Sequence, residues 1–127
     1  MRGAAGLLAC LAAAACVSSA ALRHGSDAER RQDYDRAVIE YTKAIRQHPD
    51  DANARLGLDR ARLRASQDHF LRGRRFAATG KLDQALVEYE VASELNPSNG
   101  DIDEDLRATR NKLRAKVAVA REGKTEL

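Results

Sequence analysis

Two stretches of the sequence decide the fold: residues 32–44 read QDYDRAVIEYTKA, and residues 80–92 read GKLDQALVEYEVA. They start 48 residues apart, and an aspartate, two alanines, a glutamate and a tyrosine recur at the same places in both. In each stretch the apolar residues fall at i, i+3, i+4, i+7 and i+10, the period of an α-helix with one buried face. We expect the small alanines to let a second helix approach closely, and the tyrosine to fill the gap one turn further on.

The residues around these stretches support helices throughout the chain. Pro49 and Pro97 follow the two stretches at the same distance, and each should end its helix because the proline ring removes a donor and clashes with the preceding turn. The 127 residues are rich in Ala, Leu and Arg, which favour helices, and only 4% are aromatic. The sequence therefore predicts an all-α fold.

The two stretches resemble the tetratricopeptide repeat, a helix-turn-helix unit of about 34 residues. The copies would cover about residues 18–51 and 66–99, and the first departs from the family at Gln32, where the turn glycine belongs, and at Ala28, where an aromatic belongs. The residues that carry the resemblance are Gly25, Tyr34, Ala37, Tyr41, Ala44 and Pro49 in the first copy, and Gly73, Phe76, Gly80, Leu82, Ala85, Tyr89, Ala92 and Pro97 in the second. The resemblance implies an array of about two repeats that holds a peptide or helix of a protein partner in a groove lined by the first helix of each repeat.

The spacing of 48 residues leaves an insertion between the copies. It has no proline and should form one long helix from about Ala52 to Thr79 that bridges the repeats. Two apolar stripes along it predict packing on two sides. One stripe is Leu56, Leu63 and Phe70, and the other is Ala54, Leu58, Ala61 and Ala65.

A further helix is expected after the second copy. Asp101 can cap it, and its apolar stripe should pack on the second repeat. The stripe is Ile102, Leu106, Thr109, Leu113, Val117 and Ala120. We thus expect a helical domain over residues 22–121 and a tail over residues 122–127.

Residues 1–21 have the layout of a secretory signal peptide: one arginine, an apolar run and then small residues. An uncleaved membrane anchor is the alternative, although the run is short for a spanning helix. Residues 13–16, AAAC, resemble a bacterial lipobox and suggest lipidation of Cys16, while residues 7–10, LLAC, would place it at Cys10. Cleavage without a lipid would fall after Ala20 or Ala21.

The whole arrangement is also similar to the N-terminal segment of some bacterial outer-membrane secretins. That resemblance rests on a signal peptide followed by two repeats joined by an Arg-rich helix. It implies an alternative role, in which the repeats are an architectural part of a larger protein and have no separate ligand.

No motif for catalysis, a cofactor or a metal site is found in the sequence, so we expect no enzyme. Both cysteines lie in the first 21 residues, and the three histidines are scattered. Tyr41 and Tyr89 could stack on nucleic-acid bases, but at these repeat positions we expect them in the core. The net charge of +3 permits an anionic partner without demanding one.

The predicted long helix carries many arginines, among them Arg60, Arg64, Arg72 and Arg75. They form either a solvated face, whose long stems cover apolar surface, or a basic patch for an acidic protein or lipid head groups. Export makes nucleic acid the least expected partner.

Taken together, these patterns predict an exported scaffold for protein–protein interaction in the bacterial envelope. We expect it in the periplasm or on the periplasmic face of the outer membrane, in a secretion or pilus-type assembly. Contact with the membrane itself would come only through a lipid anchor.

Overall fold

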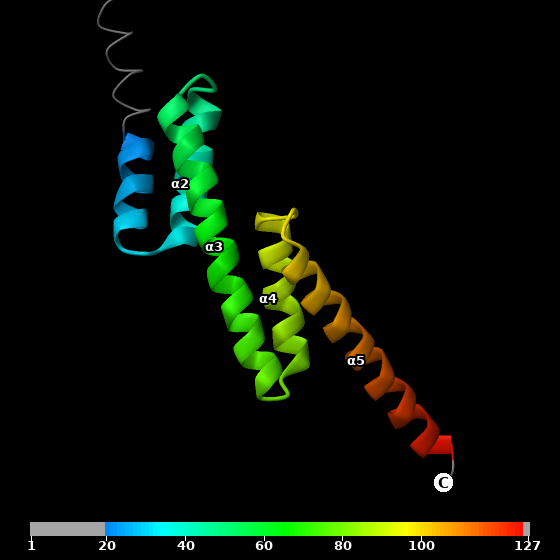
Figure 1. Cartoon of the computed structure of the whole chain (residues 1–127). Helices are drawn as coiled ribbons and strands as arrows, with labels where there is room; N and C mark the ends of the chain where they lie inside the picture. The colour runs from blue at the N-terminus through cyan, green and yellow to red at the C-terminus, as the bar shows by residue number, and fades with distance from the viewer. Residues whose placement is uncertain (1–19, 126–127) are drawn as a thin grey trace, which may run out of the picture. The chain divides into compact units, whose positions relative to one another are not determined.

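A computed structural model of the chain describes residues 20–125. Every regular element in this range is a helix, which confirms the predicted all-α class. A first helix covers residues 20–30 and is followed by α2 (Tyr34–Gln47), α3 (Ala52–Ala78), α4 (Leu82–Leu95) and α5 (Gly100–Thr125) (Figure 1). Cys10, Cys16 and nearly all of the predicted signal segment lie outside the described residues. The chain divides into two compact units, which meet between Arg62 and Leu63 within α3.

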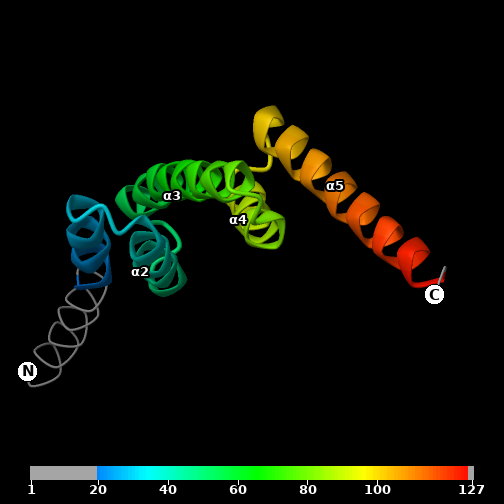
Figure 2. The same cartoon turned by 90° about the horizontal axis from the view of Figure 1, so that it is seen from below.

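In the first unit, the first helix and α2 form a hairpin and lie side by side (Figures 1 and 2). The turn between them needs a residue with left-handed backbone, and Gln32 takes a φ of 60° there. The corresponding turn before α4 uses Gly80, with a φ of 75°. Asp33 then caps α2, because its carboxylate accepts the backbone N–H of Arg36 at 3.1 Å. The hairpin is thus closed by local chemistry at the turn.

Tyr41 of α2 organises the core of the first unit. Its ring is 2% exposed and packs with Ala28, Ala37 and Ala61. A second small cluster joins Ala21, Ala44 and Ala54. The helices approach one another through alanines, so one large aromatic ring is enough to fill the space between them.

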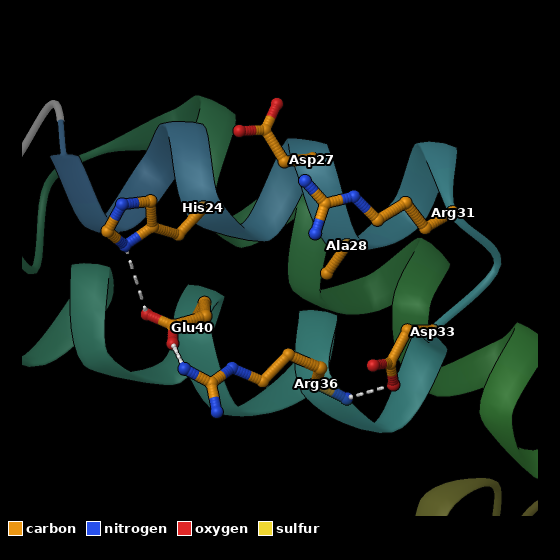
Figure 3. A pocket seen from close by; sticks show the side chains of 7 residues that line it. All are labelled: His24, Asp27, Ala28, Arg31, Asp33, Arg36 and Glu40. Carbon is orange, nitrogen blue, oxygen red and sulfur yellow. Dashed lines mark hydrogen bonds and ion pairs between the residues drawn. The ribbon is translucent and has the colours of Figure 1, made fainter.

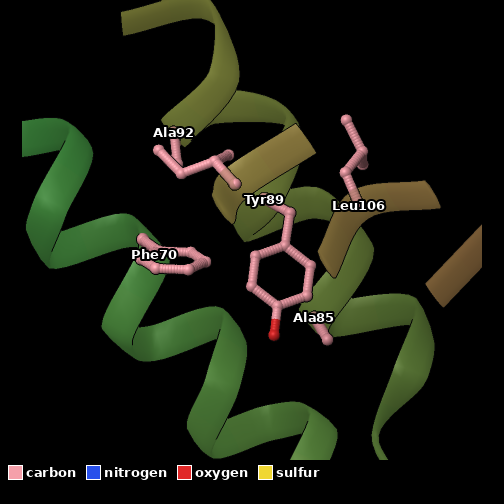
Figure 4. Packing of buried hydrophobic residues seen from close by; sticks show 6 residues of the cluster. Phe70, Ala85, Tyr89, Ala92 and Leu106 are labelled. Atoms are coloured by element: carbon pink, nitrogen blue, oxygen red, sulfur yellow. The ribbon is translucent and has the colours of Figure 1, made fainter. Parts of the chain in front are cut away.

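The second unit repeats this plan with Tyr89 of α4 (Figure 4). The Tyr89 ring lies 5.8 Å from the Phe70 ring at a tilt of 53°, within the range that aromatic pairs favour. Ser66 of α3 donates its hydroxyl to the Ala92 carbonyl at 2.8 Å. The remaining members of this buried cluster are Ala85, Ile102 and Leu106, so α5 packs on α4 as expected.

The long helix predicted from about Ala52 is confirmed as α3, but only part of its predicted packing is correct. Its alanine stripe, represented by Ala54 and Ala61, is fully buried, whereas Leu56 and Leu63 are 59% and 56% exposed. The small side chains are the ones that allow neighbouring helices to approach, so the helices pack on that side of α3. The leucines lie on the side that is turned away.

The start and end of α5 also differ from the prediction. Its cap is Asn99, whose side-chain oxygen accepts the backbone N–H of Asp101 at 3.0 Å, and Asp101 itself lies in the first turn. The helix continues to Thr125, through most of the range that we assigned to a tail. Val117 and Val119 near its end are 52% and 68% exposed.

Candidate functional site

The candidate site is a groove between the two helices of the first unit (Figure 3). Its cavity has a volume of about 410 Å³. The first helix contributes four residues spaced so that they share one face, and α2 with its cap contributes three. The lining residues are His24, Asp27, Ala28, Arg31, Asp33, Arg36 and Glu40.

Glu40 is the chemically unusual member of this lining, because its side chain is only 6% exposed. One carboxylate oxygen, Oε1, accepts from Arg36 Nη2 at 2.7 Å, one turn earlier on α2. The other, Oε2, is buried and has no hydrogen-bond partner among the described residues. Its nearest cationic candidate is His24 Nδ1 at 3.9 Å, beyond hydrogen-bond length, on a side chain that is 65% exposed. A buried carboxylate oxygen without a donor is costly, so this atom needs an explanation.

The second unit shows how the same position is satisfied. Glu88 is the equivalent of Glu40, and its Oε2 lies 2.7 Å from His69 Nδ1 and accepts from Arg72 Nε at 3.1 Å. Burial alone raises the pKa of Glu88, but the hydrogen bonds from His69 and Arg72 and the charge of Arg72 outweigh it, so the pKa lies below its ordinary value. At the 48-residue offset, Ala21 stands for His69 and His24 stands for Arg72. The first unit therefore lacks both donors that the second unit supplies.

The two signature tyrosines are core residues, and their hydroxyl groups have different surroundings. The Tyr41 hydroxyl donates to Glu29 Oε2 at 2.5 Å, and Arg60 of α3 holds both oxygens of Glu29. Burial and the hydrogen bond to Glu29 raise the pKa of Tyr41 to about 12. Burial alone raises the pKa of Glu29, but hydrogen bonds from Arg60 and Tyr41 and the charge of Arg60 lower it below its ordinary value.

In the second unit, burial comes first in raising the pKa of Tyr89, and the charge of Asp105 adds to it. Asp105 in turn accepts from Arg74 Nε at 2.8 Å. Each tyrosine thus lies beside an acid–base pair, but the acid is on the helix before it in the first unit and on the helix after it in the second.

The remaining signature residues take structural places. The four signature alanines are fully buried, and Tyr34, Phe76 and Leu82 are half-buried. Gly25 and Gly57 lie against the Tyr41 ring, and Gly73 lies against the Tyr89 ring. Both prolines follow a helix end by two residues, after Gln47 in α2 and Leu95 in α4, which agrees with their predicted role.

The four arginines of the predicted basic patch are not equivalent. Arg60 is engaged by Glu29 in the first unit, and Arg72 is engaged by Glu88 in the second. Arg64 and Arg75 are exposed. Half of the predicted set therefore has an internal ion-pair role, and a shared anion-binding role for all four stays a prediction.

The sequence patterns did not single out Glu40 or His24 as site residues. A signal was nevertheless present, because a glutamate recurs beside the tyrosine in both copies, next to the apolar stripe. Within residues 20–125, no three His, Cys, Asp or Glu side chains are grouped as a metal ion would require. In the same range, no helix has the length and apolar character needed to cross a bilayer.

Comparison with known proteins assigns no relative. No protein-family model matches the chain, and no curated protein matches its sequence.

Proposed function

We propose that the chain is an exported scaffold of the tetratricopeptide-like type, which binds another protein in the bacterial envelope. One observation carries this proposal: two helical hairpins, 48 residues apart in sequence, bury an equivalent tyrosine against a glycine of the preceding helix. Scaffolds made of repeated helical pairs commonly present extended surfaces to other proteins. The groove between the first helix and α2 is the surface of the first unit on which we expect a partner segment to lie.

A site-specific cross-linking experiment tests this role. A photoreactive amino acid would replace Arg31, which lines the groove, and in a matched variant it would replace the exposed Lys43 of α2, which does not. After illumination in living cells, we expect a discrete cross-linked protein from position 31 and none from position 43. Cross-links that are equal at the two positions, or absent from both, would contradict the proposal.

Export and lipidation need their own measurement. Mass spectrometry of the chain recovered from the membrane fraction should show a mature start within or just after residues 1–21. A diacylated Cys16 at the new N-terminus would establish the anchor, and an unmodified start at Ala21 or Leu22 would exclude it. A chain that keeps Met1 and stays in the cytoplasm would refute export itself.

A further inference from the structure

The two units place a glutamate at the same point of the repeat but complete it differently. Glu88 has both its oxygens in a region where His69 and Arg72 supply donors from the preceding helix. Glu40 has Arg36 on one oxygen and, among the described residues, no donor on the other. This difference is in composition and not in backbone, because the helical hairpin and the tyrosine beside the glutamate are present in both.

The missing donor in the first unit faces a groove that a ligand could enter. His24 lies over the Glu40 carboxylate in Figure 3, and its side chain is mostly exposed. Exposed side chains change rotamer within nanoseconds, so His24 can turn aside without unfolding any helix. The groove volume of about 410 Å³ is ample for one long side chain.

The charges of the lining are compatible with a cation. Three of the seven lining residues are carboxylates and two are arginines, so with His24 neutral the lining has a net charge of −1. Arg36 is already held by Glu40 Oε1. A carboxylate oxygen accepts only, so the group that completes Glu40 must donate an N–H or O–H. Charged donors form the stronger hydrogen bonds with a carboxylate.

We propose that the groove of the first unit is a binding site for a basic side chain, arginine or lysine, of a partner segment, which donates to Glu40 Oε2. The ligand's cation would take the place that Arg72 holds beside Glu88 in the second unit. This inference rests on the proposed scaffold function, and it names the chemistry that the groove recognises. The second unit would not bind the same group, because its glutamate is already complete.

The test uses the full chain, labelled with ¹⁵N, and short peptides as probes. Acetyl-Gly-Arg-Gly-amide and its lysine counterpart are titrated in separate experiments, and the citrulline peptide is the uncharged match for arginine. We expect saturable amide shifts confined to residues 24–31 and 36–40 with either basic peptide, and at least about tenfold weaker binding of citrulline. Equal binding of citrulline, or shifts spread over both units, would overturn the proposal.

Three variants separate this site from nonspecific charge attraction. Glu40→Gln should weaken binding of the basic probe at least about tenfold, while the matched change Glu88→Gln in the second unit should leave it unchanged. His24→Arg should also abolish binding, because the new guanidinium can complete Glu40 as Arg72 completes Glu88. His24→Ala should keep or strengthen binding, since it only opens the groove.

The outcomes distinguish this proposal from the scaffold function. If His24→Arg or Glu40→Gln binds the probe like the unchanged chain, the site is wrong, even if position 31 cross-links to a partner. If the basic probe binds as expected but no partner cross-links, the site stands and the scaffold function fails. Circular dichroism of each variant confirms that the helices are intact, and the surface change His24→Arg keeps the test valid if Glu40→Gln fails to fold.

Discussion

Replacing Gly57 by alanine is the most direct test of the packing that defines the first unit. A Cβ at this position would lie 2.5 Å from Tyr41 Cζ and 2.6 Å from Cε1. Since carbon atoms pack at about 3.5–4.0 Å, the ring would have to move by about 1 Å. It cannot move freely, because the first helix also approaches the same ring at Gly25, where an added Cβ would meet it at 2.7 Å.

Two opposing effects set the size of the change. Overpacking a well-filled core costs about 1–3 kcal/mol, and alanine in place of glycine inside a helix gains about 0.5–1 kcal/mol. Tyr41 is held by two helices and by its hydrogen bond to Glu29, so the cost should lie in the upper half of its range. We therefore expect Gly57→Ala to lower the free energy of unfolding by about 1–2 kcal/mol, which corresponds to a fall in Tm of roughly 4–8 °C per kcal/mol.

Urea unfolding followed by far-ultraviolet circular dichroism measures this change. The matched control is Gly123→Ala in α5, where an added Cβ meets nothing within 4 Å, and it should be neutral or stabilising by up to about 1 kcal/mol. In a Tyr41→Leu background, which removes the ring, Gly57→Ala should also become neutral or stabilising. The reasoning is refuted if Gly57→Ala in the unchanged chain is as stable as the parent, or more stable.

Three further predictions concern stability. Because the folded-state pKa values of Glu29 and Glu88 lie below 4.5, their contribution is present above that pH and is lost as the pH falls through the folded values; urea midpoints should drop below about pH 4.5, and less steeply in Glu88→Gln. The Tyr41 pKa of about 12 lies above its ordinary 10.0, so about 2–3 kcal/mol should be lost between pH 10 and 12, and a Tyr41→Phe chain that shows the same loss would contradict this assignment. Gln32→Gly should raise the free energy of unfolding by about 1 kcal/mol, since it relieves the φ of 60°, and a loss of stability would show that the Gln32 side chain makes a compensating contribution.

Much of the fold could be predicted from the sequence, because it depends on local periodicity. The apolar stripe around Tyr41 and its copy around Tyr89 define helices with one buried face, and the structure buries both rings to 2% exposure. The prolines mark two helix ends for a steric reason that holds in any context. What periodicity could not decide was which of two apolar stripes on α3 is covered, and Leu56 and Leu63 proved to be exposed.

The candidate site was harder to predict, because it depends on pairs of residues from different helices. Whether Glu40 finds a donor is decided by Ala21 and His24, which are about twenty residues away and reach it only after the turn at Gln32 has closed the hairpin. The repeated glutamate was visible in the alignment of the two copies. Its incomplete hydrogen bonding was not, because the distance from His24 to Glu40 is a property of the folded hairpin.

The comparison between the two units gives a physical reason for separating scaffold from site. Positions that agree between the copies, such as Tyr41 and Tyr89, are those whose packing any such hairpin needs. Positions that differ are not required by the hairpin, because both hairpins form without agreement there. His24 and Arg72 are such a pair, and they decide whether the buried glutamate is complete within the chain. Function in a repeated scaffold should therefore be sought first where a buried polar group keeps its place while its partner changes, and Glu40 is the clearest case among the described residues.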